Sequence, residues 1–174
     1  EAGEPCPPGT AGDLWFKSLV GSDFSYHNAP DKTRSAHRGD GFATLGDIGY
    51  LDDEGYLYLS DRRVDMIVSG GVNIYPAEIE GVLAEHPAVA DVAVFGIPDD
   101  EMGEAVRAAV ALVEGATWDD PLEAEVVALC RSRLAGYKCP RSFEVHPSLP
   151  RSLAGKLQKR SLRDPHWASS DRAI

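Results

Sequence analysis

Residues 61–80, with the sequence DRRVDMIVSGGVNIYPAEIE, constrain the fold of this chain more than any other stretch. Charged residues lead into the apolar run 66–68, a pattern typical of an exposed joint that enters a strand. Residues 69–71, Ser-Gly-Gly, predict a turn, because glycine tolerates positive φ and lets a ligand approach the backbone closely. Pro76 suits the first position of a helix. The stretch therefore predicts a boundary between two domains.

The residues after this boundary, 62–174, predict a small α+β domain that contains a three-stranded sheet with flanking helices. Apolar residues of its second strand alternate at period two, and acidic residues start its second helix. The predicted elements are a helix at 76–86, strands at 89–95 and 105–113, a helix that starts at Asp119, a strand at 142–145 and a short final helix.

The residues before the boundary, 1–61, predict a β-rich region. Aromatic and apolar side chains gather at 13–20, as β-structure favours. Two further runs, 48–51 and 56–60, flank a turn that ends in glycine, which is a hairpin signal. A short polar helix is predicted at 31–37.

The charge and the cysteine content argue against several classes of function. A formal net charge of −11 over 174 residues argues against nucleic acid and anionic membrane surfaces as partners. We expect neither a membrane span, which needs ~20 apolar residues, nor a signal peptide. Three cysteines without metal-ligand spacing and five scattered histidines predict neither a disulfide framework nor a metal site, and they favour a reducing cytoplasm.

Lys156 is the first candidate for chemistry. It follows Gly155 in a loop that begins with Pro150, so its ammonium can reach into a cleft as a mobile positive charge. Such a cation lowers the barrier of a reaction that builds negative charge on oxygen atoms. The alternative is a solvated surface lysine beside Lys159 and Arg160.

Asp47 and Arg62 are candidates for contacts with a nucleotide. A carboxylate at a tight Gly-Asp turn can accept hydrogen bonds from both hydroxyls of a ribose, whereas its simpler role is to bond its own backbone. The planar guanidinium of Arg62 suits phosphate and ribose oxygens. Its simpler role is a surface ion pair with Asp61 or Asp65, and Arg63 is assigned only to such a pair.

Three sequence blocks resemble motifs of the adenylate-forming enzymes, the superfamily of acyl-CoA synthetases, luciferases and peptide-synthetase adenylation domains. They are TLGDIGY at 44–50, the stretch at 61–80, and LPRSLAGK at 149–156, in the order that the family has. The block LAGYKCPR at 134–141 also matches, with a structural role. The segment SGGVNIYP resembles the corresponding segment of fatty- and aryl-acid CoA ligases more than that of peptide-synthetase adenylation domains. Ser152 stands where the family usually has threonine, a change that keeps the hydroxyl.

This resemblance implies a role for each candidate residue. Lys156 would act in the first step, in which a carboxylic acid and ATP give an acyl-adenylate and pyrophosphate. Asp47 would hold the ribose of ATP, and Arg62 would contact the nucleotide. Gly70 and Gly71 would line the pantetheine tunnel of the second step, in which coenzyme A displaces AMP, although a simple hairpin turn explains both glycines as well. Mg²⁺ would accompany ATP.

The resemblance also implies that residues 62–174 swing as a mobile lid between the two steps. The hinge would be Arg63-Val64. The family often has Asp or Lys where Val64 stands, but a hinge needs only to absorb a change in φ and ψ.

Residues 1–61 resemble the last part of the family's large N-terminal domain, a distorted β-barrel subdomain. The sequence has no Ser/Thr/Gly-rich phosphate loop that ends in lysine and no acid-binding segment. We therefore expect a fragment that needs the missing N-terminal domain, is inactive alone and binds no cofactor tightly. The alternatives are a non-catalytic lid that docks on another subunit, and part of a peptide-synthetase adenylation domain. The sequence identifies neither the acid nor the oligomeric state.

Overall fold

The computed structural model describes residues 3–21 and 24–168, and the chain divides into two compact units, Glu1–Val64 and Asp65–Ile174. The sequence predicts a domain boundary between residues 61 and 62, whereas the two units of the structure divide after Val64. Which domain of a larger enzyme each unit represents stays a prediction. No helix in the described ranges is long and apolar enough to cross a membrane.

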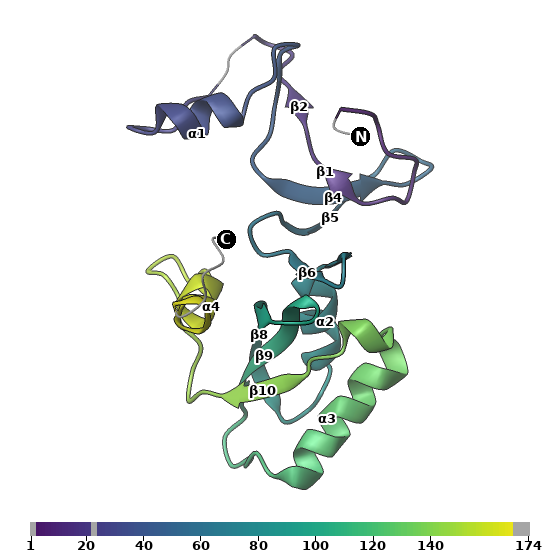
Figure 1. The fold of residues 1–174 in the computed structure, drawn as a ribbon, viewed down its shortest axis with the longest axis vertical. Coiled ribbons are helices and arrows are strands. Elements are labelled where there is room, and N and C mark those ends of the chain that lie inside the picture. The colour runs from purple at the N-terminus through teal and green to yellow at the C-terminus, as the bar shows by residue number, and fades with distance from the viewer. Residues whose placement is uncertain (1–2, 22–23, 169–174) are drawn as a thin grey trace. The chain divides into compact units, whose positions relative to one another are not determined.

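The first unit is built on a small antiparallel sheet (Figure 1). Its central strand β4 (Asp47–Leu51) pairs with β1 (Gly12–Asp13) on one side and with β5 (Leu57–Arg62) on the other. Strands β4 and β5 form the hairpin that the sequence predicts. β2 (Phe16–Lys17) and β3 (Phe42–Ala43) make a separate two-stranded ladder, and α1 (Pro30–Ser35) is the predicted short helix.

The strand predicted at 13–20 is wrong, because this segment divides between two ladders. β1 pairs with β4, whereas β2 pairs with β3, and each of these two strands has only two residues. Beyond β2, the side chains of Leu19 and Val20 are 100% and 86% exposed. Side-chain propensity alone does not reveal where a strand changes its hydrogen-bonding partner.

The second unit contains a five-stranded sheet centred on β9 (Gly103–Leu112). β9 runs antiparallel to β8 (Val89–Asp99) and parallel to β10 (Ser142–Val145). A single residue pair, Ser69 with Gly103, joins β9 to β6 (Ile67–Ser69), which turns into β7 (Val72–Ile74). The expected α+β class is confirmed, but the sheet has five strands where three were predicted. The sequence indicates a strand that is entered at 66–68 and offers a hairpin turn as one explanation of Gly70 and Gly71, but it does not predict that this hairpin joins the sheet. With three residues on each side of the turn, the two strands give little periodic signal of their own.

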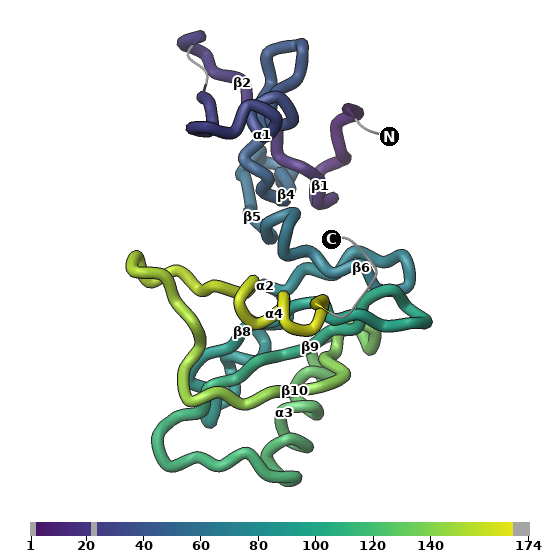
Figure 2. Tube along the Cα trace, turned by 60° about the vertical axis from the view of Figure 1, so that its left-hand side comes forward, coloured from purple at the N-terminus to yellow at the C-terminus, as the bar shows by residue number. Residues whose placement is uncertain are grey.

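Helices cover both faces of this sheet. α2 (Pro76–Leu83) and α3 (Asp120–Arg133) pack on one face, and α4 (Lys159–Trp167) packs on the other, so Figure 2 shows α3 and α4 on opposite sides of β8 to β10. Neighbouring residues of β8 accordingly belong to different cores: Val92 and Val94 to the first, Ala93 and Phe95 to the second. The near-continuous apolar runs of β8 and β9 follow from burial on both faces.

Local signals in the sequence set where the helices begin. Pro76 opens α2, and the Asp119 carboxylate accepts the N–H of Leu122 at 2.9 Å, which is the N-cap that the sequence predicts for α3. Between β10 and α4 the chain crosses the second face of the sheet, where Leu149 and Leu162 fix it in the core. The loop that carries Lys156 therefore starts and ends on a packed surface.

Candidate active site

The first unit brings Asp47 and Arg62 together. Asp47 opens β4, Arg62 closes β5, and the two residues are direct partners in the antiparallel register. Nε of Arg62 lies 3.4 Å from Oδ1 of Asp47, and the two side chains are 64% and 24% exposed. An ion pair this exposed adds about 0–1 kcal/mol to stability. Both groups therefore remain available to a ligand: the carboxylate to accept hydrogen bonds from vicinal hydroxyls, and the guanidinium to donate to phosphate or ribose oxygens.

The turn before Asp47 is fixed by its backbone. Gly46 has φ of 80°, its N–H donates to Oγ1 of Thr44 at 3.0 Å, and its carbonyl accepts the N–H of Arg63 at 2.9 Å. The block TLGDIGY thus holds the Asp47 carboxylate at a defined place at the start of the central strand β4. The Arg63 guanidinium forms an ion pair with Asp13, a partner that the sequence does not indicate.

Gly70 and Gly71 form the turn between β6 and β7. Their φ values are 57° and 79°, and two successive positive φ values are typical of the type I′ turn of a tight hairpin. The N–H of Gly70 donates to the carbonyl of Met102 at 2.7 Å. This conformation alone accounts for both glycines, so a role in binding pantetheine stays a prediction. Val64, the other half of the predicted hinge, is 69% exposed.

Lys156 lies in a hydrogen-bonded loop between β10 and α4. The N–H of Ser152 donates to the carbonyl of Lys156 at 2.8 Å, and the N–H of Gly155 donates to the carbonyl of Ser152 at 2.8 Å. The hydroxyl of Ser152 accepts the Lys156 N–H at 3.2 Å, which gives this hydroxyl a local function.

The Lys156 side chain differs from the cations beside it. Lys159 is paired with Glu80 at 2.7 Å and Arg160 with Asp164 at 2.9 Å. Within residues 3–21 and 24–168, the exposed Lys156 ammonium has neither a hydrogen bond nor an ion pair. A cation without a partner at the tip of a structured loop can bind an anionic ligand without first breaking an internal interaction.

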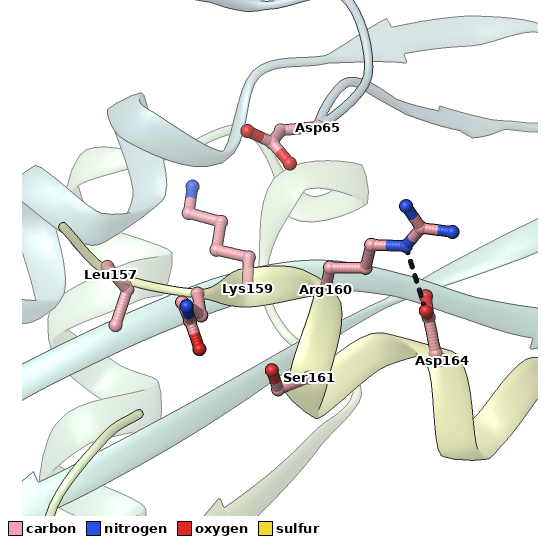
Figure 3. A pocket seen from close by; sticks show the side chains of 7 residues that line it. Asp65, Leu157, Lys159, Arg160, Ser161 and Asp164 are labelled. Carbon is pink, nitrogen blue, oxygen red and sulfur yellow. Dashed lines mark hydrogen bonds and ion pairs between the residues drawn. The ribbon is translucent and has the colours of Figure 1, made fainter. Parts of the chain in front are cut away.

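A cavity of about 450 Å³ beside this loop was not predicted from the sequence. Asp65, at the start of the second unit, lies on one side, and the first turn of α4 lies on the other, as Figure 3 shows. No spacing in the sequence indicates that these two segments meet. In the described ranges, no group of three His, Cys, Asp or Glu side chains could hold a metal ion. The residues that line the cavity are Asp65, Leu157, Gln158, Lys159, Arg160, Ser161 and Asp164.

Comparisons with known proteins agree with the sequence blocks. Residues 78–156 match the AMP-binding enzyme C-terminal domain. A long-chain-fatty-acid–CoA ligase of Bacillus subtilis is 41% identical over 162 residues, which are 93% of this chain and 28% of that protein. The chain therefore spans less than a third of the length of that relative.

Two solved structures resemble both units. ATP-bound MatB from Rhodopseudomonas palustris is 35% identical with a TM-score of 0.85, over 99% of this chain and 33% of that one. The amide bond synthetase McbA from Marinactinospora thermotolerans is 36% identical with a TM-score of 0.82, over 94% of this chain and 33% of that one. The chain belongs to the adenylate-forming superfamily, and residues 78–156, within its second unit, match the family's C-terminal domain.

Proposed function

We propose that the full-length protein is an AMP-forming acid–CoA ligase and that this chain supplies its nucleotide-contacting strands and its mobile lid. The observation that carries the proposal is the ammonium of Lys156, which has no partner among the described residues and lies at the tip of a structured loop, in a chain that also pairs Asp47 with Arg62. The B. subtilis relative is a long-chain-fatty-acid–CoA ligase, which favours a fatty acid as the substrate class.

In the proposed first step, a carboxylate oxygen attacks the α-phosphorus of ATP. The bond from that phosphorus to the bridging oxygen breaks, and pyrophosphate leaves with the electron pair. Lys156 stabilises the negative charge that builds on the phosphate oxygens, while Asp47 accepts hydrogen bonds from the ribose hydroxyls and Arg62 donates to the nucleotide. Mg²⁺ enters with the ATP phosphates, and we assign it no ligand in this chain.

In the proposed second step, the thiol sulfur of coenzyme A attacks the acyl carbon, and the thiol proton is released to solvent. The bond from that carbon to the phosphate oxygen breaks, and AMP leaves with the electron pair. We assign the Gly70-Gly71 turn to the pantetheine arm, because a turn without side chains lets an extended ligand approach the backbone. Residues 65–174 rotate between the two steps, with the change in φ and ψ taken up at Arg63-Val64.

The test is pyrophosphate release by the full-length protein with a panel of fatty and aryl acids. Lys156→Ala should lower the rate by about 10²–10³. Leu153→Ala is the control, because Leu153 lies fully exposed in the same loop and carries no charge. Preformed acyl-adenylate should still be converted to the thioester by the Lys156 variant. Acid-independent release, or equal losses in the two variants, would exclude the assignment.

A second candidate differs only in the acceptor. Because McbA is an amide bond synthetase, an amine is the alternative to coenzyme A in the second step. Supplying preformed acyl-adenylate with coenzyme A or with a panel of amines separates the two, since only the true acceptor accelerates the release of AMP. A folded protein that activates no acid at all would favour a lid that docks on another subunit.

A further inference from the structure

The loop that carries Lys156 is fixed at its first end by Arg151. Nη2 of Arg151 lies 2.7 Å from Oδ2 of Asp91, a residue of β8. Nη1 of the same guanidinium donates to the carbonyl of Gly155 at 2.9 Å. One arginine side chain therefore links a strand of the central sheet to the peptide group that directly precedes Lys156.

The loop is fixed at its other end by Lys159, the first residue of α4. Nζ of Lys159 lies 2.7 Å from Oε1 of Glu80, and the two side chains are only 14% and 19% exposed. The same Glu80 oxygen accepts the N–H of Val94 at 2.7 Å. This pair therefore joins α2, β8 and the start of α4, the helix that follows the loop in the sequence.

Between these two attachments the loop is closed on itself by backbone hydrogen bonds. Arg151 pairs with Leu157 as an antiparallel bridge, and the N–H of Gln158 donates to the carbonyl of Pro150 at 2.8 Å. The exposed tip thus has a defined conformation although it lacks a core of its own. A group that must meet a reacting phosphate gains from such placement, since a 1 Å displacement can lower a rate by about 10²-fold.

We infer that Arg151 and Lys159, each through its carboxylate partner on the domain core, are positioning residues for Lys156. The inference rests on the proposed role of Lys156 in adenylation. Arg151 sets the position of the Gly155–Lys156 peptide, and Lys159 sets the direction in which the chain leaves the loop. Neither residue is required to touch the substrate.

The first experiment measures hydrogen exchange of the loop amides in the 174-residue chain and needs no activity. Arg151→Met should raise the exchange of the amides of residues 152–158 by roughly threefold to tenfold, the effect of losing one exposed ion pair and one charge-assisted hydrogen bond. Arg141→Met is the matched control, because Arg141 pairs with Asp99 of the same strand at 3.2 Å with similar exposure. Equal exchange of the loop in the two variants would overturn the inference.

Swapping the charges of the two partners separates positioning from simple loss of a side chain. The double variant Arg151→Asp/Asp91→Arg restores a pair of opposite charges. Hydrogen exchange of its loop amides should therefore lie closer to the wild-type rate than hydrogen exchange of the loop in Asp91→Arg alone.

The second attachment is tested with Glu80→Gln, which keeps an acceptor for the Val94 N–H but removes the charge that Lys159 needs. This variant should raise the hydrogen exchange of the loop amides, while thermal unfolding shows that the chain is still folded.

The second experiment measures the two half-reactions of the full-length protein. Arg151→Met should slow acid-dependent pyrophosphate release by about 10- to 100-fold, while conversion of preformed acyl-adenylate to the thioester stays within about twofold. Equal slowing of both half-reactions would indicate general damage and refute a positioning role. If the wild type activates no acid, the proposed function fails, and the exchange measurement still decides whether these residues order the loop.

Discussion

Replacing Gly49 with alanine should separate the two strands that hold Asp47 and Arg62. Gly49 is buried in β4, next to the place where the β4–β5 register shifts. A Cβ atom at this position would overlap the backbone carbonyl oxygen of Tyr58 and lie 3.1 Å from Cδ1 of Leu14. Because a backbone carbonyl in a paired strand cannot rotate away as a side chain can, β5 would have to move.

The size of the effect follows from this overlap. Overpacking a closed site typically costs about 1–3 kcal/mol, and contact with backbone favours the upper end of that range. In a unit of this size, each kcal/mol corresponds to about 4–8 °C in the unfolding temperature. Calorimetry of the Gly49→Ala variant should therefore show unfolding of the first unit at a lower temperature than in the wild type. Hydrogen exchange should rise in the peptides that cover β4 and β5.

Gly39→Ala is the matched control in the same unit. Gly39 does not have positive φ, and a methyl group on its Cα would meet nothing within 4 Å, so alanine fits there without strain. Its effect should be neutral or stabilising by up to about 1 kcal/mol, because alanine restricts the unfolded chain. If Gly49→Ala were no more destabilising than Gly39→Ala, the close approach of β4 and β5 at Gly49 would be wrong.

Three further predictions test the second unit. Leu83→Ala should lower the free energy of unfolding by about 2–5 kcal/mol, since Leu83 is fully buried, whereas Leu153→Ala at a fully exposed site should change it by less than about 0.5 kcal/mol in the same urea titration. Burial raises the pKa of Glu104, so this carboxyl contributes stability at acidic pH that is lost as pH rises from the ordinary carboxyl pKa through the raised value. Glu104→Gln should remove this contribution to the pH dependence of unfolding, and an unchanged pH dependence would contradict the burial of this carboxyl. Burial raises the pKa of Cys130 to about 11, which leaves roughly 0.1% thiolate near pH 8, so a thiol reagent should modify the exposed Cys6 rapidly and Cys130 only after denaturant is added.

Much of the second unit could be predicted from the sequence, because its signals are local. Pro76 and Asp119 mark the starts of α2 and α3, and the long apolar runs of β8 and β9 predict strands directly. The α+β class follows from the order of these elements. The pairing order does not, since a single bridge between Ser69 and Gly103 brings the β6–β7 hairpin into the sheet. No pattern within either segment encodes that contact.

The chemistry of the motifs identified the candidate residues, but it did not identify the residues with which they form ion pairs. The pairing of Arg62 with Asp47 depends on the register of a hairpin that contains a bulge. The pair of Arg63 with Asp13 depends on where β1 lies. The Arg151 attachment of the Lys156 loop reaches back 60 residues along the chain to Asp91, and the Lys159 attachment reaches back to Glu80. Neither can be derived from spacing.

The distribution of burial makes the candidate residues suitable for functional tests. Stability of the second unit comes from two apolar clusters on the faces of its sheet, whereas Lys156 is exposed and contributes no ion pair among the described residues. In the first unit, the exposed pair of Asp47 and Arg62 accounts for about 0–1 kcal/mol, against the roughly 5–15 kcal/mol that typically holds a domain together. Substitutions at these three positions should therefore leave both units folded. A loss of activity in such variants would then report on chemistry or binding, and a parallel loss of unfolding temperature would reveal that a residue is structural after all.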